Sequence, residues 1–83
     1  LNTNKKVVEI FILSDCPWSS RAVRMLRTLQ IPHDIKVIEN DNDFKALNKR
    51  SNYSRFPQIF IDGEFIGGYS ELADLHSSGK LSN

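Results

Sequence analysis

The sequence has one cysteine among its 83 residues and no long run of apolar side chains. A single cysteine excludes a disulfide within the chain and a metal site built from several cysteines. Because small domains without disulfides are typical of a reducing compartment, we expect a cytoplasmic protein. No stretch reaches the ~18–20 apolar residues of a membrane span. Residues 1–6 are too polar for a signal peptide, so we expect no contact with a membrane.

An excess of charge of one sign is also missing. Eleven Lys and Arg residues face ten Asp and Glu residues, and the net charge of +1 gives no electrostatic case for nucleic acid as a partner. Hydrophobic residues make up 40% and charged residues 25%, as in an ordinary globular protein. The length predicts a single domain over residues 1–83, which buries roughly 60–65% of its unfolded surface.

Short apolar runs and amphipathic segments alternate along the chain. Residues 7–13 are β-branched and nearly all apolar, which predicts a strand buried on both faces. Pro17 is typical of the first position of a helix, and the apolar spacing after it predicts a helix to about residue 30. A looser alternation predicts a second strand over residues 33–38.

The second half predicts a helix, a hairpin and a last helix. Asp62-Gly63 is a strong signal for a two-residue hairpin turn. The elements around it are predicted as a helix over 43–52, a strand over 56–61, a return strand over 64–66 and a helix capped by Ser70 that runs to about 78. The whole order predicts an α/β fold with a mixed four-stranded sheet and helices on both faces.

The only sulfur atom stands directly before the first predicted helix. The thiolate is the reactive form of cysteine, and its pKa of ~8.5 falls at a helix N-terminus, where unpaired N–H groups favour negative charge. Cys16 occupies that place, at the kind of strand-to-helix junction where ligands reach α/β sheets. A lone cysteine is more often a small core residue. Here the polar Ser14 and Asp15 before Pro17 indicate an exposed loop, so we predict a reactive nucleophile.

Three motifs, in this order and spacing, resemble those of the glutaredoxins. They are Cys16-Pro17-Trp18-Ser19, Phe56-Pro57-Gln58-Ile59-Phe60-Ile61-Asp62-Gly63 and Ile66-Gly67-Gly68-Tyr69-Ser70-Glu71-Leu72. The resemblance covers nearly the whole chain. It implies a thioredoxin-like fold, glutathione as cosubstrate, and the reduction of mixed disulfides in glutathionylated proteins or small molecules. We expect the protein to be a monomer.

The resemblance also implies roles for single residues. Cys16 would accept the glutathionyl group, and Trp18 would line the glutathione groove. Pro57 matches the family's cis-proline, which would turn the backbone of Phe56 toward the peptide part of glutathione. As an alternative from the residues alone, Phe56-Pro57 could be only the start of an edge strand.

The start of the last helix would form the other half of the implied site. Gly68 would let the backbone come close to the ligand. Ser70 and Glu71 match a polar pair in the family, where the helix N-terminus would hold the γ-glutamyl carboxylate, and Tyr69 lies in the same motif. The plainer alternatives are that the glycines form only a turn and that Ser70 is only a helix cap.

The sequence departs from the family at two positions. Ser19 stands where dithiol members have a second cysteine, and a hydroxyl cannot resolve a mixed disulfide, so we expect a monothiol route. Leu13 stands where many members carry a lysine, and Asp15 opposes formation of the Cys16 thiolate. We hypothesise that Arg55 supplies part of the missing positive charge.

Two other functions compete with the enzyme. In the first, two chains and two glutathiones supply the four thiolates of a [2Fe-2S] cluster, although Pro17 counts against this carrier role. In the second, the fold is a scaffold with an idle cysteine, which would have an ordinary thiol pKa. His33 and His76 lack the spacing of metal ligands, so we expect no site for a metal ion among the side chains.

Overall fold

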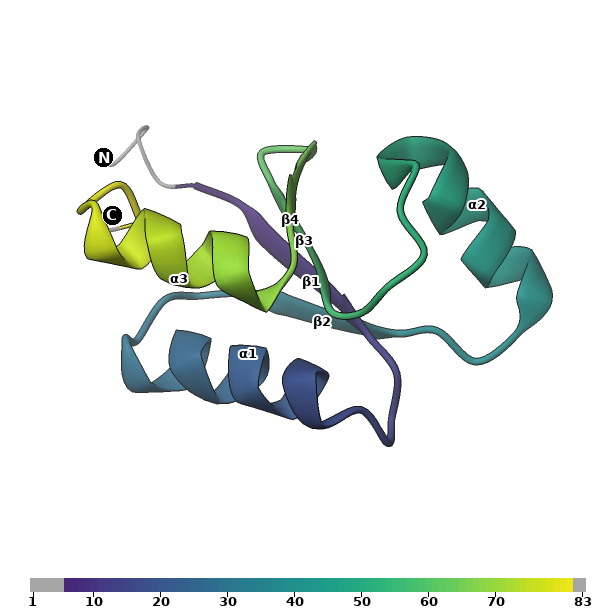
Figure 1. Cartoon of the computed structure of the whole chain (residues 1–83), viewed down its shortest axis with the longest axis horizontal. Helices are drawn as coiled ribbons and strands as arrows, with labels where there is room; N and C mark the ends of the chain where they lie inside the picture. The colour runs from purple at the N-terminus through teal and green to yellow at the C-terminus, as the bar shows by residue number, and fades with distance from the viewer. Residues whose placement is uncertain (1–5, 82–83) are drawn as a thin grey trace.

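The computed structural model of the chain describes residues 6–81 (Figure 1). Strands and helices alternate along it in the order β1 (Val8–Ile12), α1 (Pro17–Thr28), β2 (Asp34–Val37), α2 (Asp41–Ser51), β3 (Gln58–Ile61), β4 (Glu64–Gly67) and α3 (Tyr69–Ser77). Every element predicted from the sequence is present, and the ends differ from the prediction by no more than two residues.

The four strands form one mixed sheet in the order β2-β1-β3-β4. β1 runs parallel to β2, with Ile10 opposite Ile35, and antiparallel to β3, with Ile10 opposite Ile59. β4 returns antiparallel to β3 through the turn at Asp62 and Gly63, whose φ angles are 54° and 82°. Positive φ at both central residues is what a tight two-residue hairpin requires, so the predicted turn is confirmed.

The alternation of side chains along β1 divides the core into two clusters. Val8 and Ile10 pack toward α1 and α3, which lie on one face of the sheet (Figure 1). Phe11 points to the opposite face, where it packs with Leu47 of α2 and Phe60 of β3. The prediction of helices on both faces is therefore confirmed.

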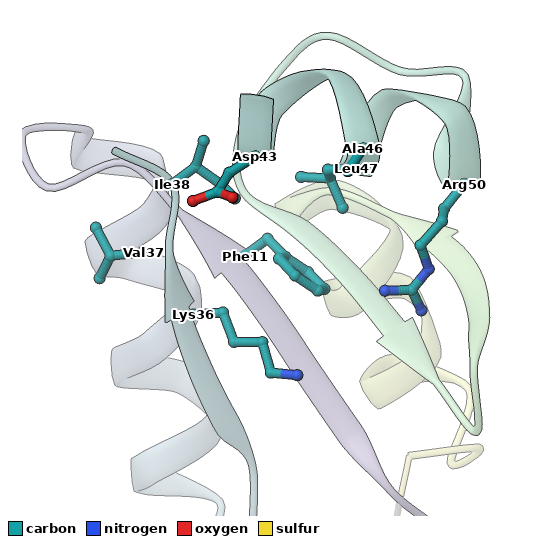
Figure 2. A pocket seen from close by; sticks show the side chains of 8 residues that line it. All are labelled: Phe11, Lys36, Val37, Ile38, Asp43, Ala46, Leu47 and Arg50. Carbon is teal, nitrogen blue, oxygen red and sulfur yellow. The ribbon is translucent and has the colours of Figure 1, made fainter. Parts of the chain in front are cut away.

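Two cationic side chains lie over the second cluster beside α2. A hollow of about 290 Å³ remains there, lined by Phe11 and Leu47 together with Lys36 and Arg50 (Figure 2). The Arg50 guanidinium carbon lies 4.3 Å from the centre of the Phe60 ring, and the Lys36 amine lies 5.7 Å from the centre of the Phe11 ring. The long side chains of Lys36 from β2 and Arg50 from α2 thus cover part of the aromatic surface of this cluster.

The capping residues of α2 and α3 explain why these helices begin at other residues than the sequence predicted. α2 begins two residues earlier than predicted because the Asn40 side chain accepts a hydrogen bond from the Asp43 N–H at 2.9 Å. The prediction that Ser70 caps α3 is wrong. The N-cap is Gly68, whose N–H donates to Glu71 Oε1 at 2.8 Å, and Ser70 lies inside the helix.

No helix within residues 6–81 is both long enough and apolar enough to cross a membrane.

Candidate functional site

Cys16 lies at the junction of β1 and α1. It is the N-cap of α1, with extended backbone angles, and Pro17 follows it as the first helical residue. Its carbonyl oxygen accepts the first helical hydrogen bond, from the Ser20 N–H at 3.1 Å. The side chain is half-buried, so the sulfur atom is neither enclosed in the core nor fully in solvent. A strand, a turn and a proline-initiated helix therefore hold a reachable thiol in one place.

The surroundings of the sulfur lower its pKa. Burial raises the pKa of the Cys16 thiol. Hydrogen bonds from the Ser19 hydroxyl and from the N–H groups of Ser19 and Trp18 lower this pKa, and together they outweigh the effect of burial, so the net shift is downward. These N–H groups belong to the first turn of α1, whose donors have no partner inside the helix. The direction agrees with the prediction of a reactive cysteine and disfavours an idle one.

Ser19 has a buried hydroxyl beside this thiol. Ser19 is 1% exposed, and its hydroxyl oxygen has no hydrogen-bond partner at ordinary geometry among the described residues; the group that it favours is the ionised sulfur of Cys16. A buried hydroxyl without a hydrogen-bond partner is unfavourable. The Cys16 thiolate would accept a hydrogen bond from this hydroxyl and so remove that cost. Ser19 therefore does more than fill the place of a second cysteine.

The loop before β3 meets the sulfur from the other side. The Cys16 thiol donates a long hydrogen bond, 3.8 Å, to the carbonyl oxygen of Phe56. The Phe56–Pro57 peptide bond is cis, as the resemblance implies, and Pro57 is buried. The hydrogen bond places the backbone carbonyl of Phe56 beside the thiol, and the predicted pairing of this backbone with glutathione stays a prediction.

Gly68 allows this loop and the start of α3 to lie close together. A Cβ atom at Gly68 would stand 3.2 Å from the carbonyl oxygen of Pro57 and 3.5 Å from the Tyr53 hydroxyl. The first of these distances is tighter than ordinary van der Waals contact, so a side chain here would push the two segments apart. Three motifs that lie far apart in the sequence therefore meet at one end of the sheet.

An aromatic and cationic stack borders the site. Trp18 is 51% exposed, and its ring centre lies 5.6 Å from that of Tyr69. The guanidinium carbon of Arg21 lies 4.8 Å from the centre of the Trp18 ring and 5.9 Å from that of Tyr69. Arg21 is not among the site residues that the sequence predicted. Its spacing of three residues from Trp18 was the signal that could have placed it on the same helical face.

A hollow of about 350 Å³ opens on the Phe56 side of the thiol. Phe56, Phe44 and Leu13 give it an apolar lining, and Glu39 and Asp41 are its charged members. No lysine or arginine of the described part of the chain lines it. The departure from the family at Leu13 therefore leaves this side of the site without a cation.

Two of the predicted site residues, Arg55 and Ser70, have no described contact with the sulfur. Arg55 is exposed, and it is not among the groups that lower the pKa of Cys16. Ser70 is exposed on the first turn of α3. Their contacts with a ligand stay predictions. Within residues 6–81, no three His, Cys, Asp or Glu side chains gather in a group that could hold a metal ion.

A sheet in the order β2-β1-β3-β4, with a reachable cysteine at the helix that follows β1, defines a thioredoxin-like domain with a candidate thiol redox site. The glutaredoxin family model matches residues 8–66. The chain therefore belongs to the glutaredoxin family, as the three motifs predicted.

Curated relatives agree with this assignment. The chain is 42% identical over 67 residues to monothiol glutaredoxin-S15, mitochondrial, of Arabidopsis thaliana, a match that covers 80% of this chain and 40% of that protein. It is 37% identical over 76 residues to the probable glutaredoxin ssr2061 of Synechocystis, covering 89% of this chain and 86% of that one. The chain thus spans about two fifths of the length of the Arabidopsis relative and most of the cyanobacterial one.

Solved structures show the same fold. A crystal structure of a buckwheat glutaredoxin–glutathione complex matches with a TM-score of 0.80 and 27% identity, covering 94% of this chain and 74% of that one. A solution structure of a glutaredoxin from Brucella melitensis matches with a TM-score of 0.80 and 28% identity, covering 96% and 89%. The fold class expected from the resemblance is confirmed.

Proposed function

We propose that the chain reduces mixed disulfides of glutathione by a monothiol route through Cys16. The observation that carries this proposal is the position of the sulfur: it is reachable, stands at the N-terminus of α1, and has three donors from Ser19 and Trp18 that favour the thiolate. Family membership supports thiol–disulfide chemistry of this kind.

The chemistry takes two exchanges. In the first, the Cys16 thiolate attacks the glutathione sulfur of the mixed disulfide. A Cys16–glutathione disulfide forms, the old disulfide bond breaks, and the substrate leaves as a thiolate that takes up a proton. In the second, a glutathione thiolate attacks the glutathione sulfur bound to Cys16, which releases glutathione disulfide and the Cys16 thiolate. Each cycle consumes one free glutathione as the reductant, because the other half of the glutathione disulfide comes from the mixed disulfide itself. Ser19 takes no part in bond exchange.

Two segments would hold the glutathione moiety during this exchange. The backbone of Phe56 lies at the sulfur and would pair with the peptide part of the ligand. On the other side, Gly68 and the first N–H groups of α3, at Tyr69 and Ser70, would receive the γ-glutamyl carboxylate. Trp18 would border the groove through its contact with Tyr69.

Arg55 would meet a carboxylate of glutathione, because it directly precedes Phe56 and no cation within residues 6–81 lines the hollow on that side. An exposed ion pair of this kind contributes about 0.2–1 kcal/mol, so Arg55→Ala should raise the KM for glutathione by about 1.5- to 5-fold. The pH profile of Cys16 alkylation should stay the same. An unchanged KM would remove Arg55 from the site.

Turnover of a small mixed disulfide tests the proposal directly. The chain is mixed with glutathione and the disulfide of glutathione and 2-mercaptoethanol, and glutathione disulfide is measured over time. We expect turnover by the unaltered chain, none by Cys16→Ser, and unchanged turnover by the neighbouring exposed Ser20→Ala. No turnover by the unaltered chain, or turnover that survives Cys16→Ser, would overturn the proposal.

A second candidate is a [2Fe-2S] carrier, favoured by the single reachable cysteine with a serine three residues later. One chain offers one thiolate, so a four-thiolate cluster would need two chains and two glutathiones. Anaerobic preparation separates the two functions: a coloured dimer supports the carrier, and a colourless monomer supports the enzyme. The monomeric state and a cytoplasmic location stay our predictions.

A further inference from the structure

A groove lies between α1 and α3, next to the redox site. Its volume is about 350 Å³. Met25 and Leu29, both half-buried, give it an apolar floor, Tyr69 closes one end, and Arg21 and Arg24 line it along α1. The groove therefore combines apolar contact area with two positive charges.

The two arginines have no carboxylate partner among the described residues. Among residues 6–81, no Asp or Glu lines the groove. Within residues 6–81, both salt bridges involve Glu9, on the opposite face of the sheet. Arg21 lies against the rings of Trp18 and Tyr69, which orients its guanidinium without neutralising its charge. The groove thus offers two positive charges that an acidic partner can neutralise.

The groove is continuous with the site around the sulfur. Arg21 and Tyr69 belong both to the groove and to the stack on Trp18, two residues after Cys16. At 1.5 Å per helical residue, Arg21 lies about 8 Å and Arg24 about 12 Å along α1 from Cys16. An extended polypeptide covers about 3.3 Å per residue, so it spans these distances in roughly two and four residues.

We propose that this groove binds an extended acidic segment of a protein substrate, with acidic residues about two and four positions from its glutathionylated cysteine. The proposal rests on the proposed function and names the class of substrate that the site prefers. A polypeptide suits the groove better than a nucleic acid, because only two arginines line it and its floor is apolar.

Peptide substrates test this preference. Each peptide carries one glutathionylated cysteine, with glutamate or glutamine at the second and fourth positions, in one set before the cysteine and in another after it. The measured quantity is kcat/KM for release of the peptide thiol. Because each of the two exposed ion pairs contributes about 0.2–1 kcal/mol, we expect one glutamate set to be favoured about 2- to 25-fold over its glutamine counterpart. The preference should shrink as salt is added.

Two arginines of α1 provide the variant and its control. Arg24→Gln removes a charge from the groove and should lower the glutamate-to-glutamine ratio about 1.5- to 5-fold. Arg27→Gln removes the same charge from an exposed residue of the same helix that does not line the groove, and it should keep the ratio. Equal ratios in the two variants, or no preference for either glutamate set, would overturn the proposal.

Two further measurements separate this inference from the proposed function. If the chain turns over the 2-mercaptoethanol mixed disulfide but acts on all peptides at equal rates, the proposal that the groove binds an acidic segment is overturned, and the proposed function stands. Binding is measured apart from activity: Trp18 is the only tryptophan and contacts Arg21, so its fluorescence reports on the groove. Titration with the unmodified glutamate peptide should change the Trp18 fluorescence more than titration with the glutamine peptide. This result is expected even if the chain shows no enzymatic turnover. Equal signals count against the groove.

Discussion

The Cys16 thiol points its hydrogen bond at the carbonyl oxygen of Phe56, 3.8 Å away, while the groups that favour its thiolate lie on α1. A carbonyl oxygen stabilises the protonated sulfur and repels the charged one. The Ser19 hydroxyl and the N–H groups of Ser19 and Trp18 do the opposite. The two protonation states of Cys16 therefore use different partners, and Ser19 is the one side chain among the donors.

Ser19→Ala removes that side-chain donor. We expect the pKa of Cys16 to rise, because burial still disfavours the thiolate and only the backbone donors remain to offset it. The profile of Cys16 alkylation against pH should move to higher pH, and alkylation at neutral pH should slow several-fold. Ser20→Ala is the matched control, since Ser20 is exposed and its N–H, which the variant keeps, is the group that bonds Cys16. An unmoved profile in Ser19→Ala would assign the low pKa to the backbone alone.

Gly67→Ala should destabilise the start of α3. Gly67 has φ of 128°, and a Cβ atom there would stand 2.5 Å from Cγ of Glu71. Glu71 would have to move and would lose its hydrogen bond with the Gly68 N–H. Strain at positive φ costs about 1–2 kcal/mol and a lost cap about 0.5–2 kcal/mol, so the free energy of unfolding should fall by about 1.5–4 kcal/mol.

Gly63→Ala is the control for backbone strain. Gly63 also has a positive φ, 82°, but nothing lies within 4 Å of an added Cβ atom. Its loss should therefore be only about 1–2 kcal/mol. Urea denaturation of both variants measures the difference, which isolates the cap of α3. Equal losses would mean that Glu71 moves without weakening the helix.

Arg50→Ala tests whether a cation holds the second core cluster together. Its guanidinium lies over Phe60 and 3.6 Å from Glu9 (Figure 2 shows Arg50 extending from α2 beside Phe11). Removing the contact with the ring and the exposed ion pair should lower the free energy of unfolding by about 1–2 kcal/mol. Lys49→Ala changes the same charge in the same last turn of α2 and should stay within about 0.5 kcal/mol. Equal effects would indicate a helix-end effect instead.

The strands, the hairpin and the position of Cys16 could be predicted from the sequence. The strands could be predicted because β-branched runs such as residues 7–13 have the period of a buried strand, and the hairpin because Asp62-Gly63 suits positive φ. The position of Cys16 followed from Pro17, which fixes the start of α1. These signals are local, so a single sequence carries them.

Contacts between distant segments carry no such signal. The hydrogen bond between Cys16 and Phe56 joins residues 40 positions apart, and only the resemblance to a family placed them together. The cap of α3 was misassigned because serine is a common cap and glycine has no side chain to cap with. The spacing from Gly68 to Glu71 was the missed signal, since a glutamate three residues after the cap reaches back to its N–H.

Glu9→Gln should change the dependence of stability on pH. The hydrogen bond from Lys36 is the largest cause that lowers the pKa of the Glu9 carboxyl, burial opposes it, and the charges of Lys36 and Arg50 add to it. Because the pKa is lower in the folded state than in the unfolded chain, the stabilisation is present above the unfolded pKa. It is lost as the pH falls through the folded pKa.

The variant should therefore lose about 0.5–1 kcal/mol at pH 7 and nothing at a pH below the folded pKa of Glu9. Urea denaturation at the two pH values measures this. Glu64→Gln is the control, since Glu64 is exposed on β4 and forms no salt bridge with a described residue. A loss of stability that is the same at both pH values would show that Glu9 acts through packing rather than charge. The positions of Lys36 and Arg50 over the aromatic cluster would then not depend on the charge of Glu9.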